Sequence, residues 1–452
     1  MDETAPLLGP NSINDVTSEN LSLDERRENS AGTTTWYASI FIVINAALGA
    51  GLLEFPYAFS ISGGVMVSLI VQGILIAFIV GSLFLLAYCS EFNQSTTFPS
   101  TMRSICGKPT EVASAICIII YTYGTCITFL IVISDQLSQF FRFVTSEDDF
   151  CNRWYMNKKF TLTVTSFLFI LPLCFSKKID FLKYASYAGV VAVLYVIIMI
   201  IVRFADPLHK RAEIVISYGP TSFLEIFTVI PTVCFSYQCH VSIIPIYSCM
   251  KGRNTKNFAK TVLIAISVCL FAYSVSATLG YYTFGNTVNT DILLSYDPPS
   301  VDVVIAVLMI AAKTYTTYPI LLFCGRVEIE KLWMYVWRLT DEMAAVHEFK
   351  RRCVIAVTWF LSTLLIAIYV PTIAIVIDVL GGLAALFIFF FPGMCLMKIA
   401  LDYVPSSKLF KKRFFITAAV CFMFLGAFLF GLVTTQSIMD DISKPPQNTS
   451  TC

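Results

Sequence analysis

The stretch NAALGAGLLEFP, residues 45–56, lies in the middle of an apolar segment that covers residues 36–59. Gly49 and Gly51 fall inside this segment, and each glycine weakens a helix by about 1 kcal/mol, so that two of them permit local unwinding. Within a bilayer, unwound backbone is stable only where it lines a cavity or is buried in protein. Glycine-mediated close packing of two membrane helices is the alternative. The segment therefore predicts either a broken helix or a tight helix contact.

The composition indicates the class of protein. The chain has 452 residues, 57% of them hydrophobic and only 13% charged, with a mean hydropathy of +0.74. Too few polar residues are present to cover a water-facing surface. The apolar runs are continuous and about 20 residues long, without the alternation of a membrane barrel. We therefore expect an all-α polytopic membrane protein, and the net charge of +1 gives no indication of nucleic-acid binding.

Several other classes of function find no support. Most of the 15 cysteines lie inside apolar segments, where cysteine behaves as a small hydrophobic residue. The sequence has no CxxC or Cys/His metal spacing and no nucleophile–base pairing, so an enzyme and an enzymatic cofactor are not expected. A channel is disfavoured because there is no pore-loop signature and no repeated ring of charges.

Eleven apolar stretches are long enough to cross a bilayer. They cover residues 36–58, 64–89, 112–140, 160–175, 182–204, 220–247, 258–283, 301–323, 353–372, 374–397 and 414–437. The fourth stretch is short, and the ninth and tenth are separated only around Pro371, so ten or twelve spans are the alternatives.

The placement of lysine and arginine predicts the orientation. With the N-terminus in the cytosol, 22 of these residues lie on the cytosolic side and 8 on the opposite side, which follows the positive-inside rule. Residues 1–35 are then a cytosolic tail whose polar composition predicts disorder. Residues 438–452 form a C-terminal tail on the other, lumenal side.

A second interrupted segment, IFTVIPTVCFSYQCHVSIIPIY, covers residues 226–247. It contains Pro231 and Pro245, with the polar residues Ser236, Gln238 and His240 between them. Proline removes a backbone donor and clashes with the preceding turn, so this helix is not expected to run straight.

The two interrupted segments open the two halves of the chain. Interrupted helices at corresponding positions are typical of transporters built from inverted repeats. We therefore predict repeats over residues 36–204 and 220–397, an extra helix over 414–437, and a transport site where the two broken helices cross. The transporter domain as a whole covers residues 36–437.

Candidate ligands of a coupling cation lie near the first break and in the eighth span. Asn45 lies one helical turn before Gly49, and Thr316 and Thr317 precede Pro319. Hydroxyl and carbonyl oxygens suit a hard cation such as sodium, and the unwound carbonyl of Ala46 would complete the ligand set. The alternatives are an interhelical hydrogen bond for the asparagine and hydroxyl bonds back to the helix's own carbonyls for the threonines.

Ionisable residues within spans are costly and are usually functional. Five occur here, Glu54, Asp135, Glu225, Lys313 and Asp378, of which Glu54 and Lys313 are expected to lie deepest. If the first and eighth spans meet, Glu54 and Lys313 could form a buried ion pair. Asp135, Glu225 and Asp378 fall nearer a membrane face.

Three further side chains are candidates on chemical grounds. His240 is the one histidine within a span, and it is interpreted as a structural histidine, with proton sensing as the alternative. Tyr121 and Tyr123 lie beside Gly124 in the third span. They are interpreted as packing residues, or else one of their hydroxyls receives a substrate carboxylate.

The tails carry two short motifs. Glu3, Leu7 and Leu8 form an acidic dileucine pattern, which in a cytosolic tail predicts recognition by sorting adaptors. Asn448 begins an Asn-Thr-Ser acceptor for N-glycosylation on the predicted lumenal side.

Five stretches together resemble the sodium-coupled neutral amino acid transporter family over residues 34–437. They are FIVINAALGAGLLEFPYAF, YTYGTCITFLIVISDQ, FSYQCHVSIIP, TTYPILLFCGR and GGLAALFIFFFPG. The resemblance is strongest to a lysosomal member that moves glutamine and asparagine. It implies the leucine-transporter-like 5+5 fold with one additional, eleventh helix, and it places the chain in the lysosomal membrane, with the plasma membrane as the less favoured location.

The resemblance also implies roles for individual residues. Asn45 and Thr317 match sodium ligands of the family, the Gly49–Gly51 loop would take the substrate's carboxylate, and residues 235–240 would face its amino or side-chain groups. The implied substrate-binding set is Leu48, Gly49, Ala50, Gly51, Tyr121, Tyr123, Phe235, Tyr237 and His240. Glu54 and Lys313 depart from the family pattern near the ion site, so protons as well as sodium are candidate coupling ions.

The sequence therefore predicts a lysosomal secondary transporter that exports neutral amino acids by alternating access. The alternative is a membrane-embedded amino acid sensor that signals through its cytosolic tail. The expected partners are a small neutral amino acid, membrane lipids and sorting adaptors, and no nucleic acid.

Overall fold

The computed structural model describes residues 34–145, 154–175, 182–206, 214–251, 253–338 and 346–443. In these ranges the backbone is helical except for connecting segments, and β pairing is limited to one isolated bridge between Thr34 and Met250. The dileucine residues Glu3, Leu7 and Leu8 and the acceptor Asn448 lie outside the described residues.

The α-helices are α2 (Trp36–Ala47), α3 (Gly51–Ile61), α4 (Val65–Asn93), α5 (Phe98–Cys106), α6 (Lys108–Val144), α8 (Lys158–Thr165), α9 (Leu171–Cys174), α10 (Leu182–Ala205), α11 (Ile230–Ser236), α12 (His240–Ser248), α13 (Thr255–Phe284), α14 (Val301–Trp337), α16 (Glu348–Tyr369), α17 (Ile373–Ala385), α18 (Phe391–Asp402) and α19 (Leu409–Ser443). Single turns of 3₁₀-helix are η1 (Trp154–Met156), η4 (Phe223–Phe227), η5 (Gly285–Thr287), η6 (Ile292–Ser295) and η8 (Ser406–Lys408), and π-helical turns are η2 (Ser166–Ile170) and η7 (Leu386–Phe390).

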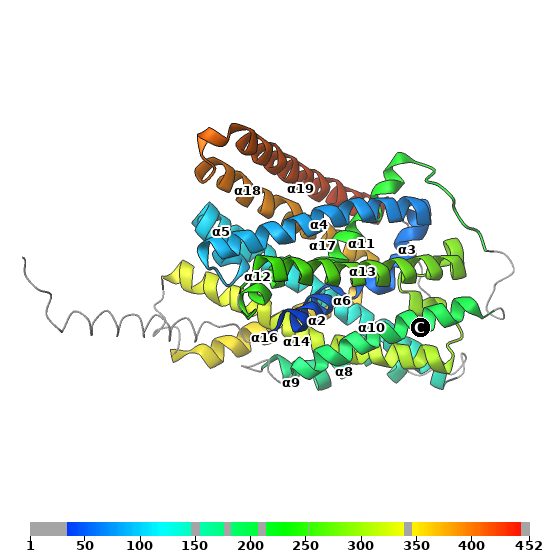
Figure 1. Ribbon diagram of the computed structural model, residues 1–452. Helices are drawn as coiled ribbons and strands as arrows, with labels where there is room; N and C mark the ends of the chain where they lie inside the picture. The colour runs from blue at the N-terminus through cyan, green and yellow to red at the C-terminus, as the bar shows by residue number, and fades with distance from the viewer. Residues whose placement is uncertain are drawn as a thin grey trace, which may run out of the picture.

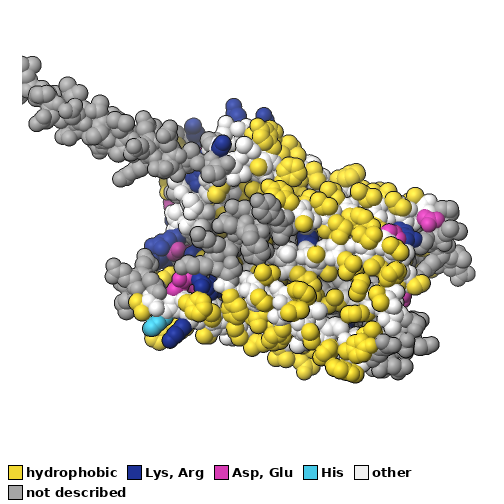
Figure 2. All heavy atoms as spheres, turned by 90° about the horizontal axis from the view of Figure 1, so that it is seen from below, with side chains coloured by type: hydrophobic (Ala, Val, Ile, Leu, Met, Phe, Trp, Pro, Cys, Tyr) yellow, Lys and Arg dark blue, Asp and Glu magenta, His cyan; other side chains and the backbone are white. Residues whose placement is uncertain are grey.

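Nine described helices are long and apolar enough to cross a membrane, and the bent pair α2–α3 makes a tenth. The predicted class, an all-α polytopic membrane protein, is therefore confirmed. The remaining expected span, residues 160–175, is helical through α8, η2 and α9 and is short, as its sequence indicated. Hydrophobic side chains cover the middle of the face shown in Figure 2, with charged side chains toward its ends, as expected of a surface that faces lipid.

The first predicted break is present. α2 ends at Ala47 and α3 begins at Gly51, and the two half-helices are bent by 56°. Leu48 leaves helical geometry with ψ at 81°, so the turn around it is unwound. The interpretation of Gly49 and Gly51 as simple packing glycines in a continuous helix is wrong.

The second break is also present, but not at the prolines. The helix stops at Ser236 and resumes at His240, so the unwound residues are 237–239. Pro231 lies in the first turn of α11, where a backbone N–H would have no helical acceptor, so proline there breaks no hydrogen bond. Pro245 is accommodated inside α12. The prolines therefore flank the break and do not create it.

The broken helices lie in the middle of the bundle (Figure 1). α13 packs against α2, α3 and α4 on one side, and the long helices α6 and α14 pack against each other and against α10 and α17. α11 packs on α17, while α18 and α19 form an outer pair along one edge. This arrangement encloses both breaks in protein, which is what unwound backbone in a membrane requires.

Several bounds differ from those expected from hydropathy. α6 and α14 have 37 residues each because their polar ends continue the helix beyond the apolar stretch. α5 was not predicted, since its residues are not apolar enough to span a membrane; it is stabilised by a capping box between Thr97 and Ser100. The last helix begins at Leu409 and ends at Ser443, so it extends at both ends beyond the predicted 414–437.

The contact of α11 with α17 generates a first prediction. A Cβ at Gly381 would lie 2.3 Å from the Cα of Pro231, which is backbone and has no rotamer to give way. We expect Gly381→Ala to lower the stability by about 1–3 kcal/mol, as overpacking does, measured as a fall in the thermal unfolding temperature of the purified protein. Gly431→Ala, which has open space, is the matched control. Equal unfolding temperatures for the two variants would contradict the packing described here.

Candidate functional site

The two breaks touch each other. Gly51, the first residue of α3, lies against Ser236, the last residue of α11, so closely that a Cβ on the glycine would be 1.8 Å from the serine Oγ. Both residues are buried, and the Ser236 hydroxyl has no hydrogen-bond partner among the described residues. The crossing of two broken helices, predicted from the sequence, is therefore formed at this pair.

One tyrosine of α13 spans both breaks. The Tyr273 hydroxyl lies 2.6 Å from the Ala47 carbonyl oxygen and 3.3 Å from the Ser236 carbonyl oxygen, so it donates to the ends of two half-helices at once. These carbonyls lost their helical partners when α2 and α11 ended, and in the fully buried surroundings of Tyr273 water does not replace them. Sequence reasoning missed Tyr273 because a tyrosine in an apolar helix has no local pattern that distinguishes it from a packing residue.

The next carbonyl of the first break is held by a lysine. The Lys313 ammonium group donates to the Leu48 carbonyl oxygen from α14. The aliphatic part of the lysine lies against Gly189 of α10, where a Cβ would be 3.2 Å from the lysine Cγ. A cation on this carbonyl is favourable because the C-terminal end of α2 carries the negative end of the helix dipole.

A small cavity opens at the first break, with room for about one water molecule. It is lined by Gly49, Ala50, Leu52 and Leu53 of the break and α3, by Phe129 and Val132 of α6, and by Ile310, Lys313 and Thr314 of α14. The residues from α6 and α14 were not predicted, because apolar side chains that line a cavity do not differ in sequence from those that fill a core.

The first break presents opposite polarities on its two sides. The N-terminus of α3 has no side-chain cap, and its first amides lack helical acceptors, so it can bind an anion. The C-terminus of α2 presents carbonyl oxygens, which bind donors or cations. A zwitterion has both kinds of charge, so the geometry suits a ligand with a carboxylate and an ammonium group.

Two of the predicted ion ligands lie in the last turn of α2, before the first break, and the other two lie on α14, within about one turn of Lys313. Asn45 and Ala46 are half-buried in the last turns of α2. The Thr316 and Thr317 hydroxyls donate to the Lys313 carbonyl at 2.9 and 2.7 Å, so they bond back to their own helix. A hydroxyl that donates in this way keeps its oxygen lone pairs, which remain suitable for a cation.

Of the two candidate tyrosines in α6, one reaches the breaks. The Tyr121 hydroxyl lies 3.4 Å from the Phe235 carbonyl oxygen in the last turn of α11, and the two rings are 6.2 Å apart. The Tyr123 ring instead packs edge-on against Trp359 of α16 at 5.2 Å, away from both breaks.

Two other side chains of the candidate set point away from the first break. The buried Tyr237 hydroxyl accepts a hydrogen bond from Gln72 at 2.8 Å, and its ring packs against Tyr273 at 5.0 Å. The buried His240 ring is hydrogen-bonded through Nε2 to Ser82 of α4 at 2.7 Å. These contacts hold α11 and α12 onto neighbouring helices, which is the structural interpretation of His240.

The ion pair suggested between Glu54 and Lys313 does not form. Glu54 is buried in α3, and its carboxyl group faces Thr232 of α11 and Asp378 of α17, while Lys313 binds the Leu48 carbonyl. Glu54 lies beyond the break, where α3 has turned toward α11, so it does not face α14. The hypothesis was wrong about the pairing.

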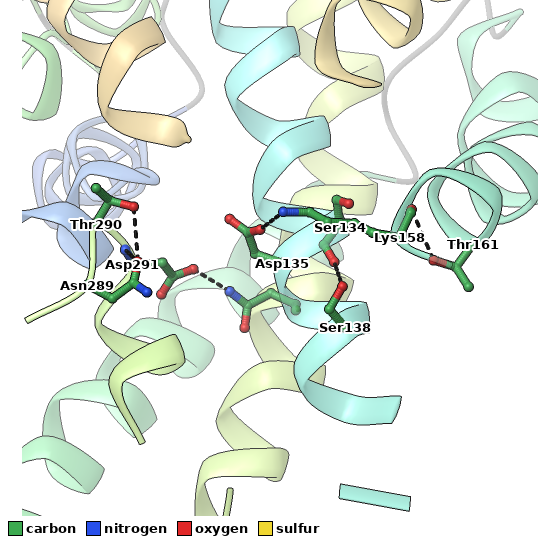
Figure 3. Close-up of polar contacts among 9 residues, drawn as sticks. Ser134, Asp135, Ser138, Lys158, Thr161, Asn289, Thr290 and Asp291 are labelled. Atoms are coloured by element: carbon green, nitrogen blue, oxygen red, sulfur yellow. Dashed lines mark hydrogen bonds and ion pairs between the residues drawn. The ribbon is translucent and has the colours of Figure 1, made fainter. Parts of the chain in front are cut away.

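Asp135 belongs to a separate polar cluster, one turn beyond the cavity-lining Val132 on α6. Its carboxylate is buried and lies 2.5 Å from the Lys158 ammonium of α8. The adjacent Gln136 donates to the carboxylate of Asp291 at 2.6 Å (Figure 3). Asp135 was expected nearer a membrane face than Glu54; its own carboxylate is buried, and its partner Lys158 is partly exposed. Glu225 does lie near the surface, where it accepts hydrogen bonds from Thr221.

The two membrane helices are broken and meet at their breaks. The helix ends at the first break have opposite polarity and border a cavity. These features are typical of a secondary transporter of small zwitterions. The family model described as "Transmembrane amino acid transporter protein" matches residues 32–439, and the chain belongs to that family. It is therefore a multi-pass membrane transporter of amino acids and not an enzyme.

Related proteins and a related structure agree with this assignment. The chain is 39% identical to sodium-coupled neutral amino acid transporter 7 of Danio rerio, over 99% of this chain and 95% of that protein. It is 40% identical to the protein of the same name from Homo sapiens, over 91% of this chain and 89% of that protein. The crystal structure of MhsT in complex with L-phenylalanine superposes with a TM-score of 0.53 at 13% identity, over 90% of this chain and 99% of the other. That likeness confirms the predicted leucine-transporter-like fold.

The contact between the two breaks is testable by substitution. We expect Gly51→Ala to separate the ends of α3 and α11, because the new methyl group would overlap the Oγ and Cβ atoms of Ser236. Transport of any substrate should fall at least about tenfold, which corresponds to about 1.4 kcal/mol. The measurement is flux into proteoliposomes. Gly73→Ala on α4, where nothing lies within 4 Å, is the control and should retain flux. Full activity of Gly51→Ala would show that the two breaks need not touch.

The tyrosine bridge generates a further prediction. Tyr273→Phe removes the donor shared by the Ala47 and Ser236 carbonyls, and buried unsatisfied groups cost about 1–3 kcal/mol. We expect a lower unfolding temperature together with weaker substrate binding. Tyr282→Phe, nine residues further along α13, should change neither quantity. An unfolding temperature for Tyr273→Phe equal to that of the control would mean that the bridge contributes nothing.

Proposed function

We propose that the protein is a sodium-coupled transporter of neutral amino acids such as glutamine and asparagine, which it exports from the lysosome to the cytosol by alternating access. The observation that carries the proposal is the contact of two broken helices at Gly51 and Ser236, with uncapped helix ends around a cavity. The names of the related transporters support sodium and a neutral amino acid as the transported species.

The substrate carboxylate would bind at the N-terminus of α3, which has no side-chain cap. The Gly49 amide donates to the Ala47 carbonyl at 3.0 Å, so the amides offered to the carboxylate would be those of Ala50 and Gly51. The substrate ammonium group would bind the carbonyls at the end of α11, among them those of Phe235 and Ser236. Both carbonyls have hydroxyl donors, at 3.4 Å from Tyr121 and 3.3 Å from Tyr273. These are long, weak hydrogen bonds that a charged ammonium group would displace. Tyr237 and His240 would position α11 and α12 and leave the contacts with substrate to the backbone.

Sodium would bind beside the substrate, between the end of α2 and α14. Its ligands would be Asn45, the carbonyl of Ala46, and the hydroxyls of Thr316 and Thr317, all neutral oxygens of the kind that hard cations prefer. Lys313 already places a positive charge on the adjacent Leu48 carbonyl. The sodium site is therefore built next to a fixed cation, and sodium is held by the dipoles and oxygens of α2 and α14 and not by a carboxylate.

Alternating access would follow from the packing. The broken helices α2–α3 and α11–α12 pack with α4 and α13 in one group, and α6 packs with α14 and α17 in a second group, which contacts the first through α11 and α17. Relative rotation of these two groups would open the cavity first to one face of the membrane and then to the other. The predicted dileucine motif Glu3, Leu7 and Leu8 supports delivery to the lysosome through sorting adaptors.

The proposal is tested by flux of labelled glutamine into proteoliposomes, with sodium and pH gradients imposed separately. We expect a sodium gradient to drive uptake. Asn45→Ala and Thr317→Ala should each raise the sodium concentration for half-maximal flux about tenfold or more, because one ligand is worth roughly 1.4 kcal/mol or more. Thr163→Ala on α8, whose hydroxyl also bonds back to its own helix at 2.7 Å, is the matched control. Flux that is indifferent to sodium in the unmodified protein would refute sodium coupling, and absence of flux under every gradient would favour a sensor.

A further inference from the structure

A short segment between α13 and α14, residues 285–300, packs against three helices whose residues line the cavity at the first break; we call it the lid. Its helical turn η6 contacts α3 on one side and α6 and α14 on the other, so it connects the two groups of helices that must move apart. Two glutamines of α6 attach it. Gln136 donates to Asp291 at 2.6 Å, and Gln139 donates to the carbonyls of Leu293 and Tyr296 at 3.3 and 2.9 Å.

The carboxyl group at the centre of this attachment is completely enclosed. Asp291 has no exposed surface, and its Oδ1 accepts the Leu293 amide at 2.9 Å in addition to the bond from Gln136 to Oδ2. Asp135, which precedes Gln136 on α6, presents a second buried carboxyl group beside the same turn (Figure 3). The one cation of the cluster is Lys158 of α8, which is 2.5 Å from Asp135.

The charges of Asp135, Asp291 and Lys158 do not sum to zero when both carboxyl groups are ionised. Among the described residues, two buried carboxylates and one ammonium group leave one negative charge uncompensated beside Asp291, which has no exposed surface, and this is strongly unfavourable. A proton removes that charge. The Gln136 amide can serve either form of Asp291: its Nε2 donates to the carboxylate, and its Oε1 is a buried acceptor without a partner among the described residues. After the amide turns over, a protonated Asp291 would donate to it.

Among the residues that the structure describes, no charged group other than Lys158 compensates Asp291. Arg142, further along α6, pairs with Asp297 of the lid at 3.2 Å. On α14 the nearest carboxylate, Asp302, is bound by Arg203 of α10, and the one carboxylate of α3, Glu54, faces α11 and α17. Lys159 of α8 lies over the Tyr369 ring at 5.5 Å.

We propose that Asp291, together with Asp135 and Lys158, forms a proton-binding site that takes up one proton each time the lid closes over the pathway. This rests on the proposed transport function for its role, because it makes closure of one gate proton-linked. Burial and the Asp135 charge raise the pKa of Asp291 to about 8, whereas an exposed aspartate in an open lid would titrate near about 3.9.

The sign of the effect follows from these two values. The closed lid binds the proton more tightly than the open lid, so closure is favoured as the pH falls. The full advantage is reached below about pH 4, the pKa of the exposed group, and it is lost as the pH rises through about 8. Between these limits the ratio of closed to open lid changes by up to about tenfold per pH unit. An acidic compartment facing the lid would therefore hold it closed.

Hydrogen–deuterium exchange of the full chain in lipid nanodiscs tests the proposal without requiring transport. Labelling times are scaled to the intrinsic exchange rate at each pH from 5 to 8. In the unmodified protein, protection of the lid amides should rise as the pH falls. Asp291→Asn, which mimics the protonated carboxyl group, should keep the lid protected at every pH. Asp297→Asn is the matched control on the same segment and should retain the pH dependence.

Two further variants separate the charge effect from a structural one. Asp135→Asn should move the midpoint of protection to lower pH, because it removes the repelling charge, and Lys158→Met should move it to higher pH. Protection that does not change with pH in the unmodified protein, an unchanged pH dependence in Asp291→Asn, or shifts of both midpoints in the same direction would overturn the proposal. If the protein shows this behaviour but no amino acid flux, the proposed function fails while the proton site stands.

Discussion

The structure depends on how it treats backbone groups that lose their helical partners inside a membrane. When α2 ends at Ala47 and α11 ends at Ser236, their last carbonyls are left in surroundings that exclude water, where an unsatisfied group costs several kcal/mol. Tyr273 satisfies one carbonyl from each helix, and Lys313 satisfies a third. The breaks persist because donors from α13 and α14 are held in place for them.

These donors come from helices that lie far away in sequence, which explains how much of the site could be predicted. The first break was predictable because Gly49 and Gly51 are local signals of a weak helix. The second break was predictable in kind, but its position at residues 237–239 was not, since it is determined by packing around Ser236 and not by the prolines. The bridging role of Tyr273 and the position of Lys313 on Leu48 required the three-dimensional arrangement of α13 and α14.

The same reason explains the outcome for the charged residues. Sequence alone identified Glu54, Lys313 and Asp135 as costly and therefore significant, but it could not choose their partners. Lys313 was expected to pair with a carboxylate and instead binds a carbonyl, because the end of a helix offers a partial negative charge that no sequence pattern records. Asp291 was missed altogether, since it lies in a connecting segment that hydropathy places outside the membrane and its burial depends on Gln136 and Asp135 of α6.

Two regions of the molecule therefore solve the same physical problem in different ways. At the breaks, fixed donors neutralise partial charges of the backbone, and under the proposed function the uncapped helix ends would bind a zwitterion and a cation. At the lid, two buried carboxylates face one ammonium group, and among the described residues no second cation restores neutrality. A buried site with an excess negative charge closes only when it binds a proton that neutralises this charge. Val132 lines the cavity one helical turn before Asp135. Because of this short separation, a proton taken up at the lid would act on the helix that also borders the binding cavity, and α6 would connect closure of the lid with occupation of the site.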